Sequence, residues 1–391
     1  MRVLIVTHKF PNASDPLNSP FNRQQFAALA KRCEIEVLAS IPWFPGAGLF
    51  ARWSAAGRLL GVPRQASIDG LPVEYVRYLH IPRVARGIAG VLYAASLLRA
   101  VLRRRGRYDV LLGSWAFPDG VGAIALARLL GIPAVVKVHG SDMNVLARMP
   151  CIARNLRWAL PRARRVVAVS RPLGDVVASF GVPRDRIDIV PNGVDAELFH
   201  PRDRARARAD LGHPHDTRRW LLYVGRVEET KGVLDLIAAF ALLAGRRRDV
   251  RLVMVGDGSA RAACERAAGD LLGDRVLLVG SRPLEDVPRW MAACDALVLP
   301  SWAEGMPNVV VEALASGRRV VATAVGGTPD LVTGPDLGEL VPPRSPGLLA
   351  DALGRAADAP YRPEDVARAG ARHSWEESAR RLEGALREAL A

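Results

Sequence analysis

Two cations lie in a loop after a strand-like run in the second half of the sequence. Arg226 follows the apolar run Trp220–Val224, and Lys231 comes five residues later, just before an amphipathic stretch that begins at Val233. A helix that begins there directs free N–H groups and the positive end of its dipole at the loop. The pattern predicts a diphosphate site, with a solvated surface turn as the alternative. It is not the phosphate-binding loop of nucleotide hydrolases, because no Gly-Lys-Ser/Thr follows.

Two carboxylates lie eight residues apart after the apolar run Ala296–Leu299. Glu304 falls in the loop, and Glu312 falls on a helix that we expect to begin near Asn308. Asn308 is an N-cap candidate, which would leave the amides of Val309 and Val310 free at the helix start. Free amides bind phosphate, while carboxylates accept hydrogen bonds from hydroxyls. The combination suits a sugar nucleotide, although each acid alone is also typical of an ordinary surface position.

A third loop has the sequence Gly256-Asp257-Gly258 and also follows an apolar run. It begins like a dinucleotide-binding fingerprint, but Arg261 stands where the third Gly or Ala belongs. The pattern therefore disfavours a dehydrogenase and favours a turn beside a nucleotide or a plain structural turn.

Strand-like and helix-like patterns alternate along the 391 residues, which predicts parallel sheets covered on both faces. Two series of strands are separated by a polar segment, residues 195–217. We therefore expect an α/β protein with two doubly wound domains, residues 1–195 and 196–370, that face each other across a cleft. Ligands of such sheets bind beyond the carboxyl ends of the strands. The predicted strands are Val3–Val6, Ile35–Ala39, Val110–Leu112, Ala134–Val138, Arg165–Val169, Ile187–Val190, Trp220–Val224, Arg251–Val255, Val276–Val279, Ala296–Leu299, Val320–Ala322 and Gly338–Val341.

The net charge of +14 is concentrated in one half of the chain. Residues 1–195 contain 27 basic and 12 acidic side chains, whereas residues 196–391 contain 27 and 28. This asymmetry predicts an anionic partner for the first half: a membrane surface, an anionic glycan or lipid, or nucleic acid. Arg-rich codon usage is the alternative explanation, but it should add arginines to both halves of the chain equally. Within residues 81–107, an apolar stretch bracketed by arginines is either an interfacial helix or an ordinary packed helix.

The remaining composition indicates a soluble globular protein of a reducing compartment. Four cysteines are scattered without a Cys-x-x-Cys motif, which disfavours disulfides and a structural zinc site. No apolar run reaches the roughly 20 residues of a membrane-spanning helix. We expect a cytoplasmic protein, peripheral on the inner face of the plasma membrane.

The spacing from Glu304 to Glu312 matches the Glu-x7-Glu motif of retaining GT-B glycosyltransferases, and the chain as a whole resembles glycosyltransferase family 4, of the bacterial cell-surface polysaccharide type. The resemblance implies the GT-B fold, with two Rossmann-like domains of which the first binds acceptor and the second binds donor. It also implies that a C-terminal helix in residues 371–391 packs back across the domains. The further matching segments are His139-Gly140-Ser141-Asp142, Pro191-Asn192-Gly193, Gly225-Arg226, Lys231-Gly232, Gly256-Asp257-Gly258 and Gly326-Gly327-Thr328-Pro329-Asp330.

Roles follow from this resemblance residue by residue. Arg226 and Lys231 match the pair that neutralises the donor diphosphate, Glu304 the acid beside the donor sugar, and Glu312 the acid that accepts from the ribose hydroxyls. His139 matches a histidine of the first domain that faces the donor sugar. The other implied substrate contacts are the loop Gly305, Met306, Pro307 and Asn308 at the sugar hydroxyls, Val309 and Val310 at the phosphates, Asn192 near the cleft, and Arg23. A turn asparagine and a surface arginine are the alternatives for the last two.

The expected activity is transfer of a sugar, with retention, from a UDP- or GDP-sugar to a glycan or lipid-linked acceptor in cell-surface polysaccharide or glycolipid synthesis. No Asp-x-Asp occurs in the chain, so we expect no essential metal and no other cofactor. The expected partners are the donor, the acceptor and an anionic membrane, without nucleic acid. The glycine-free loop at residues 11–25 departs from the Gly-Gly loop that family members often carry. A nucleotide-sugar epimerase or sugar-phosphate synthase, and a non-enzymatic basic membrane-binding protein, are the alternatives.

Overall fold

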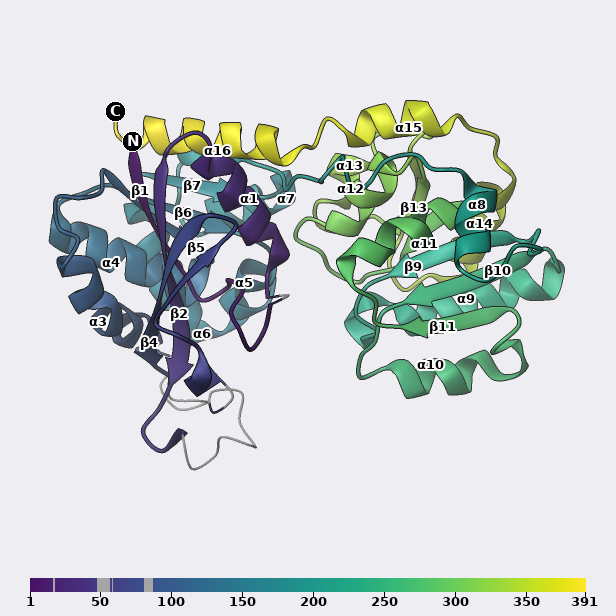
Figure 1. The fold of residues 1–391 in the computed structure, drawn as a ribbon, viewed down its shortest axis with the longest axis horizontal. Coiled ribbons are helices and arrows are strands. Elements are labelled where there is room, and N and C mark those ends of the chain that lie inside the picture. Colours follow the sequence, from purple (N-terminus) through teal and green to yellow (C-terminus); the bar gives the residue numbers. More distant parts are fainter. Residues whose placement is uncertain (17, 48–56, 58, 81–86) are drawn as a thin grey trace. The chain divides into compact units, whose positions relative to one another are not determined.

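The computed structural model describes residues 1–16, 18–47, 57, 59–80 and 87–391. Contacts divide the chain into two compact units (Figure 1). The first unit comprises Met1–Gly193 and Trp375–Ala391, and the second comprises Val194–Ser374. The C-terminal segment thus belongs to the first unit, although the rest of that unit precedes the second in sequence.

The first unit is built on an eight-stranded sheet in the order β3-β4-β2-β1-β5-β6-β7-β8, parallel except for the antiparallel pair β3 and β4. Its strands are β1 (Arg2–Thr7), β2 (Glu34–Trp43), β3 (Gln65–Ile68), β4 (Leu71–Leu79), β5 (Val110–Ser114), β6 (Ala134–Val138), β7 (Arg165–Ala168) and β8 (Ile187–Ile189). Its α-helices are α1 (Pro20–Ala30), α3 (Ala89–Leu102), α4 (Val121–Leu130), α5 (Ser141–Asn144), α6 (Pro150–Ala159), α7 (Arg171–Ala178) and α16 (Trp375–Glu388).

Helices α1 and α16 share one hydrophobic core with the central strands of this sheet. Phe26 of α1 and Leu382 of α16 are fully buried in the same cluster as Ile5 of β1. A hydrogen bond of 2.8 Å from Gln25 to Ser378 also joins the two helices. The apolar positions of α16 recur at helical spacing, so burial of one face explains why this helix packs here. Helix α3 packs against α4, with Tyr93 and Leu97 fully buried.

The second unit has a six-stranded parallel sheet in the order β11-β10-β9-β12-β13-β14. Its strands are β9 (Arg219–Val224), β10 (Val250–Val255), β11 (Val276–Gly280), β12 (Ala296–Leu299), β13 (Arg319–Thr323) and β14 (Gly338–Val341). Its α-helices are α8 (Arg204–Asp210), α9 (Val233–Arg246), α10 (Arg261–Ala268), α11 (Val287–Ala293), α12 (Asn308–Ala315), α13 (Thr328–Leu331), α14 (Pro346–Asp358) and α15 (Pro363–Gly370).

The two sheets confirm the predicted α/β class, and every predicted strand overlaps an observed one. Strands β3 and β4 were not predicted. They form a hairpin whose turn is Asp69-Gly70, both with positive φ, which is a strong short-range hairpin signal. Strand β4 pairs with β2 at its other side and alternates between buried and more exposed positions. Its mixed pattern lacks the continuous apolar run of the central strands.

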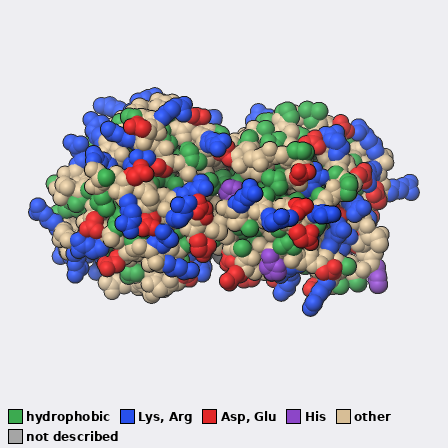
Figure 2. All heavy atoms as spheres, turned by 90° about the horizontal axis from the view of Figure 1, so that it is seen from above, with side chains coloured by type: hydrophobic (Ala, Val, Ile, Leu, Met, Phe, Trp, Pro, Cys, Tyr) green, Lys and Arg blue, Asp and Glu red, His purple; other side chains and the backbone are tan. Residues whose placement is uncertain are grey.

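The arginine-flanked stretch in residues 81–107 is mostly the packed helix α3. Tyr93, Leu97 and Val101 of α3 are fully buried, as the ordinary packed alternative requires. Residues 81–86 lie outside the described residues. No helix in the described ranges has the length and apolar character needed to cross a bilayer. Many Lys and Arg side chains, coloured blue, lie on the surface of the first unit on the face drawn in Figure 2.

Candidate active site

The loops after β9 and β12 meet at the carboxyl ends of the second sheet. Gly232 has φ of +65°, and a Cβ there would lie 2.0 Å from the carbonyl oxygen of Pro300. The amide of Trp302 donates to the carbonyl of Thr230 at 3.0 Å. Only glycine allows this close approach, so the residue that follows Lys231 holds the loop of Lys231 against the loop of Glu304.

The Glu304 loop is held from its other side by the loop after β13. Gly326 has φ of +52°, and a Cβ there would lie 2.0 Å from the carbonyl oxygen of Glu304. The amide of Gly327 donates to the carbonyl of Gly305 at 2.9 Å. Three strand-end loops are therefore locked together backbone to backbone, which fixes where the Glu304 side chain begins.

Lys231 and Glu304 form an ion pair at this edge of the sheet. The Nζ atom lies 2.6 Å from Oε1, and the side chains are only 22% and 10% exposed. Partial burial makes the pair stronger than one in open water, and neither charge is left without a counterion. The predicted meeting of these two residues, 73 positions apart, is therefore present in the structure.

Arg226 does not join this pair. Its guanidinium is 70% exposed and contacts Glu228 at 2.7 Å, while its backbone carbonyl accepts a 2.6 Å bond from the Tyr223 hydroxyl. The backbone of the loop is thus fixed, but its long side chain lies at the surface. The structure brings Lys231 to Glu304 and leaves Arg226 with a local partner.

Helix α12 begins differently from the prediction. Asn308 is the first helical residue, and the N-cap is Pro307, which has an extended backbone and no side-chain cap. The expectation that Asn308 caps the helix is wrong, because the preceding proline ends the extended loop one residue earlier. The amide of Val310 donates to the Pro307 carbonyl at 3.1 Å, so it is not free as expected. Val309 keeps a first-turn amide without a backbone partner among the described residues.

Glu312 lies one turn into α12 and is partly buried. Burial raises the pKa of its carboxyl to about 7. No neighbouring cation offsets that burial, and within the described part of the chain its carboxyl has no hydrogen-bond partner. An acid held in this way, without a structural partner, indicates a position kept for something other than stability.

Replacing Glu312 by glutamine should therefore stabilise the protein in a pH-dependent way. The pKa is raised, so the unfolded chain releases its proton first as the pH rises from 4.5 towards about 7, and native stability falls across that window. E312Q should raise the free energy of unfolding by about 1 to 3 kcal/mol near pH 8 and change it little near pH 4. Urea denaturation at both pH values measures this, with Glu285→Gln, an exposed acid of the same unit, as control. An equal gain at both pH values would contradict the burial argument.

The first unit presents a second cluster at the carboxyl ends of β5 and β6. His139 is 9% exposed, and its ring stacks on Trp115 with centroids 5.2 Å apart. Its Nε2 lies 3.0 Å from the Ser114 hydroxyl, while Nδ1 is buried without a partner in the described residues. Burial, followed by the nearby charge of Lys137, holds the imidazole pKa well below its usual value. His139 is therefore neutral at pH 7.

A histidine–aspartate pair beside this cluster was missed by the sequence analysis. His8 follows β1, and its Nδ1 lies 2.8 Å from the fully buried Oδ2 of Asp119, which also accepts the His8 amide at 3.1 Å. Trp115, in an unusual backbone conformation with φ of +121°, stands edge-on to the His8 ring. A carboxylate at Nδ1 orients Nε2 as a hydrogen-bond acceptor for a hydroxyl. The sequence feature that could have indicated a role for His8 was its position just after the first strand.

Two further buried ionisable side chains support the loop of His139, and no role was predicted for either. Asp142 is fully buried and accepts the amides of Ala116, His139, Gly140 and Met143 at 2.7 to 3.1 Å. Lys137, also fully buried, contacts the side-chain oxygen of Gln25, and burial lowers its pKa to about 7. The sequence signal for the buried Lys137 was the presence of a lysine within the apolar run Ala134–Val138. By accepting amides from both loops, Asp142 holds the loop after β5 against the loop after β6, which contains His139.

Two further residues expected to bind substrate, Arg23 and Asn192, also belong to the first unit. Arg23 forms an ion pair with Asp69 at 2.6 Å, and both side chains are more than a third exposed. This is the surface role that the sequence left open as the alternative. Asn192 is 5% exposed in the turn before Gly193. Across the described ranges, no three His, Cys, Asp or Glu side chains come together as a metal site would require.

Comparison with known proteins places these observations in a family. Residues 61–198 match the model of Glycosyltransferase Family 4, and residues 218–358 match that of Glycosyl transferases group 1. A 2-deoxystreptamine glucosyltransferase of Streptomyces kanamyceticus is 32% identical over 77% of this chain and 83% of its own. The putative teichuronic acid biosynthesis glycosyltransferase TuaC of Bacillus subtilis is 28% identical over 91% and 89%.

Solved structures with the same fold include Anabaena Alr3699/HepE in complex with UDP. It aligns with a TM-score of 0.75 at 19% identity, over 99% of this chain and 100% of its own. The same protein with UDP-glucose aligns with a TM-score of 0.68 at 21% identity, over 99% of each chain.

Proposed function

Since the chain belongs to glycosyltransferase family 4, we propose that it moves a sugar from a nucleoside-diphosphate sugar to a glycan or lipid-linked acceptor, with retention at the anomeric carbon. Membership confirms the resemblance seen in the sequence, and the two parallel-sheet units have the GT-B fold. The protein is a glycosyltransferase of glycan or polysaccharide synthesis, an enzyme of class EC 2.4.

The ion pair of Lys231 with Glu304 carries the proposal for the donor. Lys231 lies at the end of a turn whose next helix, α9, begins at Val233, and Glu304 lies in the loop before α12. A donor diphosphate would bind the ammonium, and its sugar hydroxyls would donate to the carboxylate. Before the donor arrives, the two side chains neutralise each other. The UDP and UDP-glucose in the HepE structures support a nucleotide-sugar donor.

In the transfer, an acceptor oxygen forms a bond to the anomeric carbon while the bond from that carbon to the diphosphate breaks. Negative charge grows on the leaving nucleoside diphosphate, which takes the acceptor proton. Lys231, Arg226 once its side chain leaves Glu228, and the Val309 amide stabilise that charge more in the transition state than in the ground state. They therefore act on turnover as well as affinity.

The acceptor is assigned to the first unit. His8, oriented by Asp119, lies at the carboxyl end of β1, where open α/β sheets bind ligands. Neutral His139 lies at the carboxyl end of the parallel strand β6, and its proposed role stays the one that the resemblance implies, facing the donor sugar. Asn192 and Arg23 stay as secondary candidates. The segment at residues 11–25 lacks the Gly-Gly loop that family members often carry, so its contacts with the acceptor should differ from theirs.

The experiment for this function is a screen of UDP- and GDP-sugars for diphosphate release that depends on an added glycan or lipid-linked acceptor. NMR of the product then gives the anomeric configuration. Transfer with retention supports the proposal. Release without any acceptor, epimerised donor, or transfer only to a sugar phosphate would replace it with another GT-B activity.

Transfer should not need a divalent metal, because Lys231, Arg226 and helix amides supply the positive charge at the diphosphate. Excess EDTA should leave the initial rate within about twofold of its untreated value. The matched control is EDTA saturated with magnesium. Loss of activity that added manganese restores would contradict this prediction.

The cellular setting that we propose is the cytoplasmic face of an anionic membrane. The excess of basic residues in the first half of the chain supports it, since such a surface attracts arginine-rich proteins. A glycan acceptor carried on lipid would be presented there.

A further inference from the structure

Arginines without acidic partners gather on one surface of the first unit. Between residues 120 and 164 the sequence contains one carboxylate, Asp142, which is fully buried. The exposed arginines of this surface form no ion pair with any described carboxylate; they are Arg128, Arg154, Arg157, Arg162, Arg164 and Arg186. Elsewhere many exposed arginines of this protein are paired, so the surface keeps its charge unneutralised.

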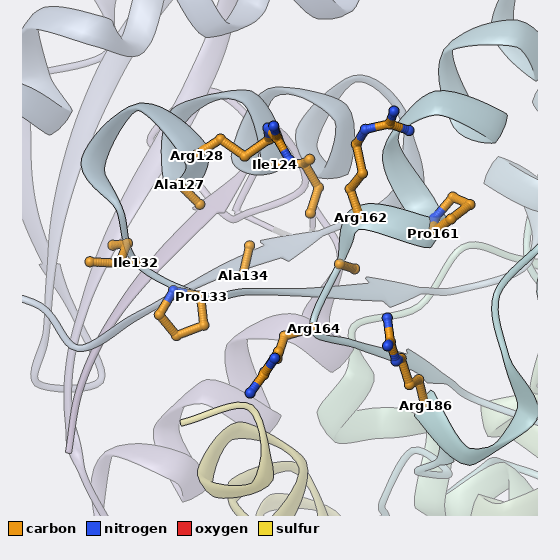
Figure 3. Close-up of a pocket in the computed structure, with 11 residues that line it drawn as sticks. Ile124, Ala127, Arg128, Ile132, Pro133, Ala134, Pro161, Arg162, Arg164 and Arg186 are labelled. Atoms are coloured by element: carbon orange, nitrogen blue, oxygen red, sulfur yellow. The ribbon is translucent and has the colours of Figure 1, made fainter. Parts of the chain in front are cut away.

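Four of these arginines line one pocket of about 300 Å³ (Figure 3). Arg128 comes from the end of α4, Arg162 and Arg164 from the segment before β7, and Arg186 from the residue before β8. Ala134, the first residue of β6, also lines the pocket, which places it at the amino ends of the strands, the opposite edge from His139. No carboxylate lines it, although Asp185 lies exposed next to Arg186 in sequence. Such a site suits a phosphate group.

An apolar groove of about 590 Å³ lies along the same helix. It is lined by residues of α4 together with Ile88 and Val91 from the start of α3 and Trp158 from α6. Val91 is 64% exposed and Trp158 is 39% exposed. Arg154 adds a charge to the groove. Large apolar side chains left in water beside cations mark an interaction surface.

Trp158 and Arg162 connect the groove to the pocket. The Arg162 guanidinium lies 5.4 Å from the centre of the Trp158 ring and donates to the Trp158 carbonyl at 2.7 Å. Leu129, 61% exposed, is the neighbour of Arg128 at the end of α4. The two features are therefore parts of one strip that follows α4, here called the α4 strip, which is mainly apolar at the groove and mainly cationic at the pocket.

We propose that the α4 strip docks the protein on an anionic phospholipid bilayer. Lipid phosphates would bind Arg128, Arg162, Arg164 and Arg186, while Trp158 and Val91 enter the interface. A soluble phosphate would need the arginines alone, so the exposed apolar groove favours a bilayer over a free anion or a nucleic acid. The inference gives the proposed membrane location a defined surface, and it rests on charge and packing within the first unit rather than on the transfer reaction.

The test uses flotation of the full chain with phosphatidylcholine vesicles, with and without about one third phosphatidylglycerol. Binding should require phosphatidylglycerol and weaken as salt rises. Combined replacement of Arg128, Arg162, Arg164 and Arg186 by glutamine should weaken it on the order of 100-fold. Trp158→Ser alone should weaken it about tenfold or less. Donor turnover with a soluble acceptor should stay unchanged in both variants, so this test and that of the transferase fail separately.

The matched control removes four exposed, unpaired arginines of the second unit: Arg206, Arg248, Arg266 and Arg372, each to glutamine. It loses the same net charge and should keep vesicle binding within about threefold. Equal loss in both quadruple variants, or binding that ignores phosphatidylglycerol, would overturn the proposal. The proposal would also be overturned if the wild-type protein bound no vesicles but bound duplex DNA or inorganic phosphate, and the first variant lost that binding.

Discussion

Replacement of Lys231 by methionine should lower kcat by roughly 100- to 1,000-fold, with a smaller change in KM for the donor. Methionine keeps the length and the packing of the stem but removes the ammonium. Lys231 is the one cation of the expected diphosphate site that the structure holds in place, 2.6 Å from Glu304 and mostly buried. Charge builds on the leaving diphosphate during the reaction, so the loss should fall on turnover.

Steady-state kinetics with the best donor of the screen measures this effect. Arg248→Met is the control, because Arg248 is exposed in the same unit and has no ion pair. Thermal unfolding of both variants separates catalysis from stability. A K231M enzyme with the turnover of wild type would remove Lys231 from the diphosphate site.

Glu304→Gln should lower kcat/KM by roughly 100-fold. The amide has the size of the carboxylate but no charge, so it weakens both the hydrogen bonds to the donor sugar and the hold on the Lys231 ammonium. The backbone of this loop is fixed by the close approach of Gly326, so the variant should fold normally. Glu285→Gln serves as the matched control.

The two substitutions should also be coupled. Each single variant leaves one charge of the pair without its partner, so the losses should not add, and the double variant should be little worse than K231M. Full additivity would mean that the two residues act independently rather than as a pair. An E304Q enzyme with unchanged kcat/KM would mean that Glu304 has only a structural role.

The fold could be predicted from the sequence where burial was complete. Central strands such as Trp220–Val224 and Ala134–Val138 are continuous apolar runs because both faces of the sheet are covered. Strand β4 was not predicted because about half of its residues are more exposed than those of the central strands, and only the Asp69-Gly70 turn signalled its hairpin. The pairing of Lys231 with Glu304 was predictable because loops at the carboxyl ends of neighbouring parallel strands meet.

The rest of the site depended on contacts that spacing does not encode. His8 and Asp119 lie 111 residues apart, and Asp119 is buried in a short turn with no periodic pattern. The side chain of Arg226 has several acids within reach, and the sequence does not say that Glu228 is the one it takes. The start of α12 shifted by one residue because proline, not asparagine, ends the preceding loop.

Hydrogen–deuterium exchange with and without the donor nucleotide tests the central claim most directly. The account predicts that a nucleoside diphosphate, or its sugar conjugate, slows exchange of amides in residues 225–236 and 304–313. The K231M variant should show weaker protection of the same segments at a nucleotide concentration that half-saturates the wild-type enzyme. Protection confined to other segments, with a nucleotide that supports transfer, would show that the diphosphate binds elsewhere.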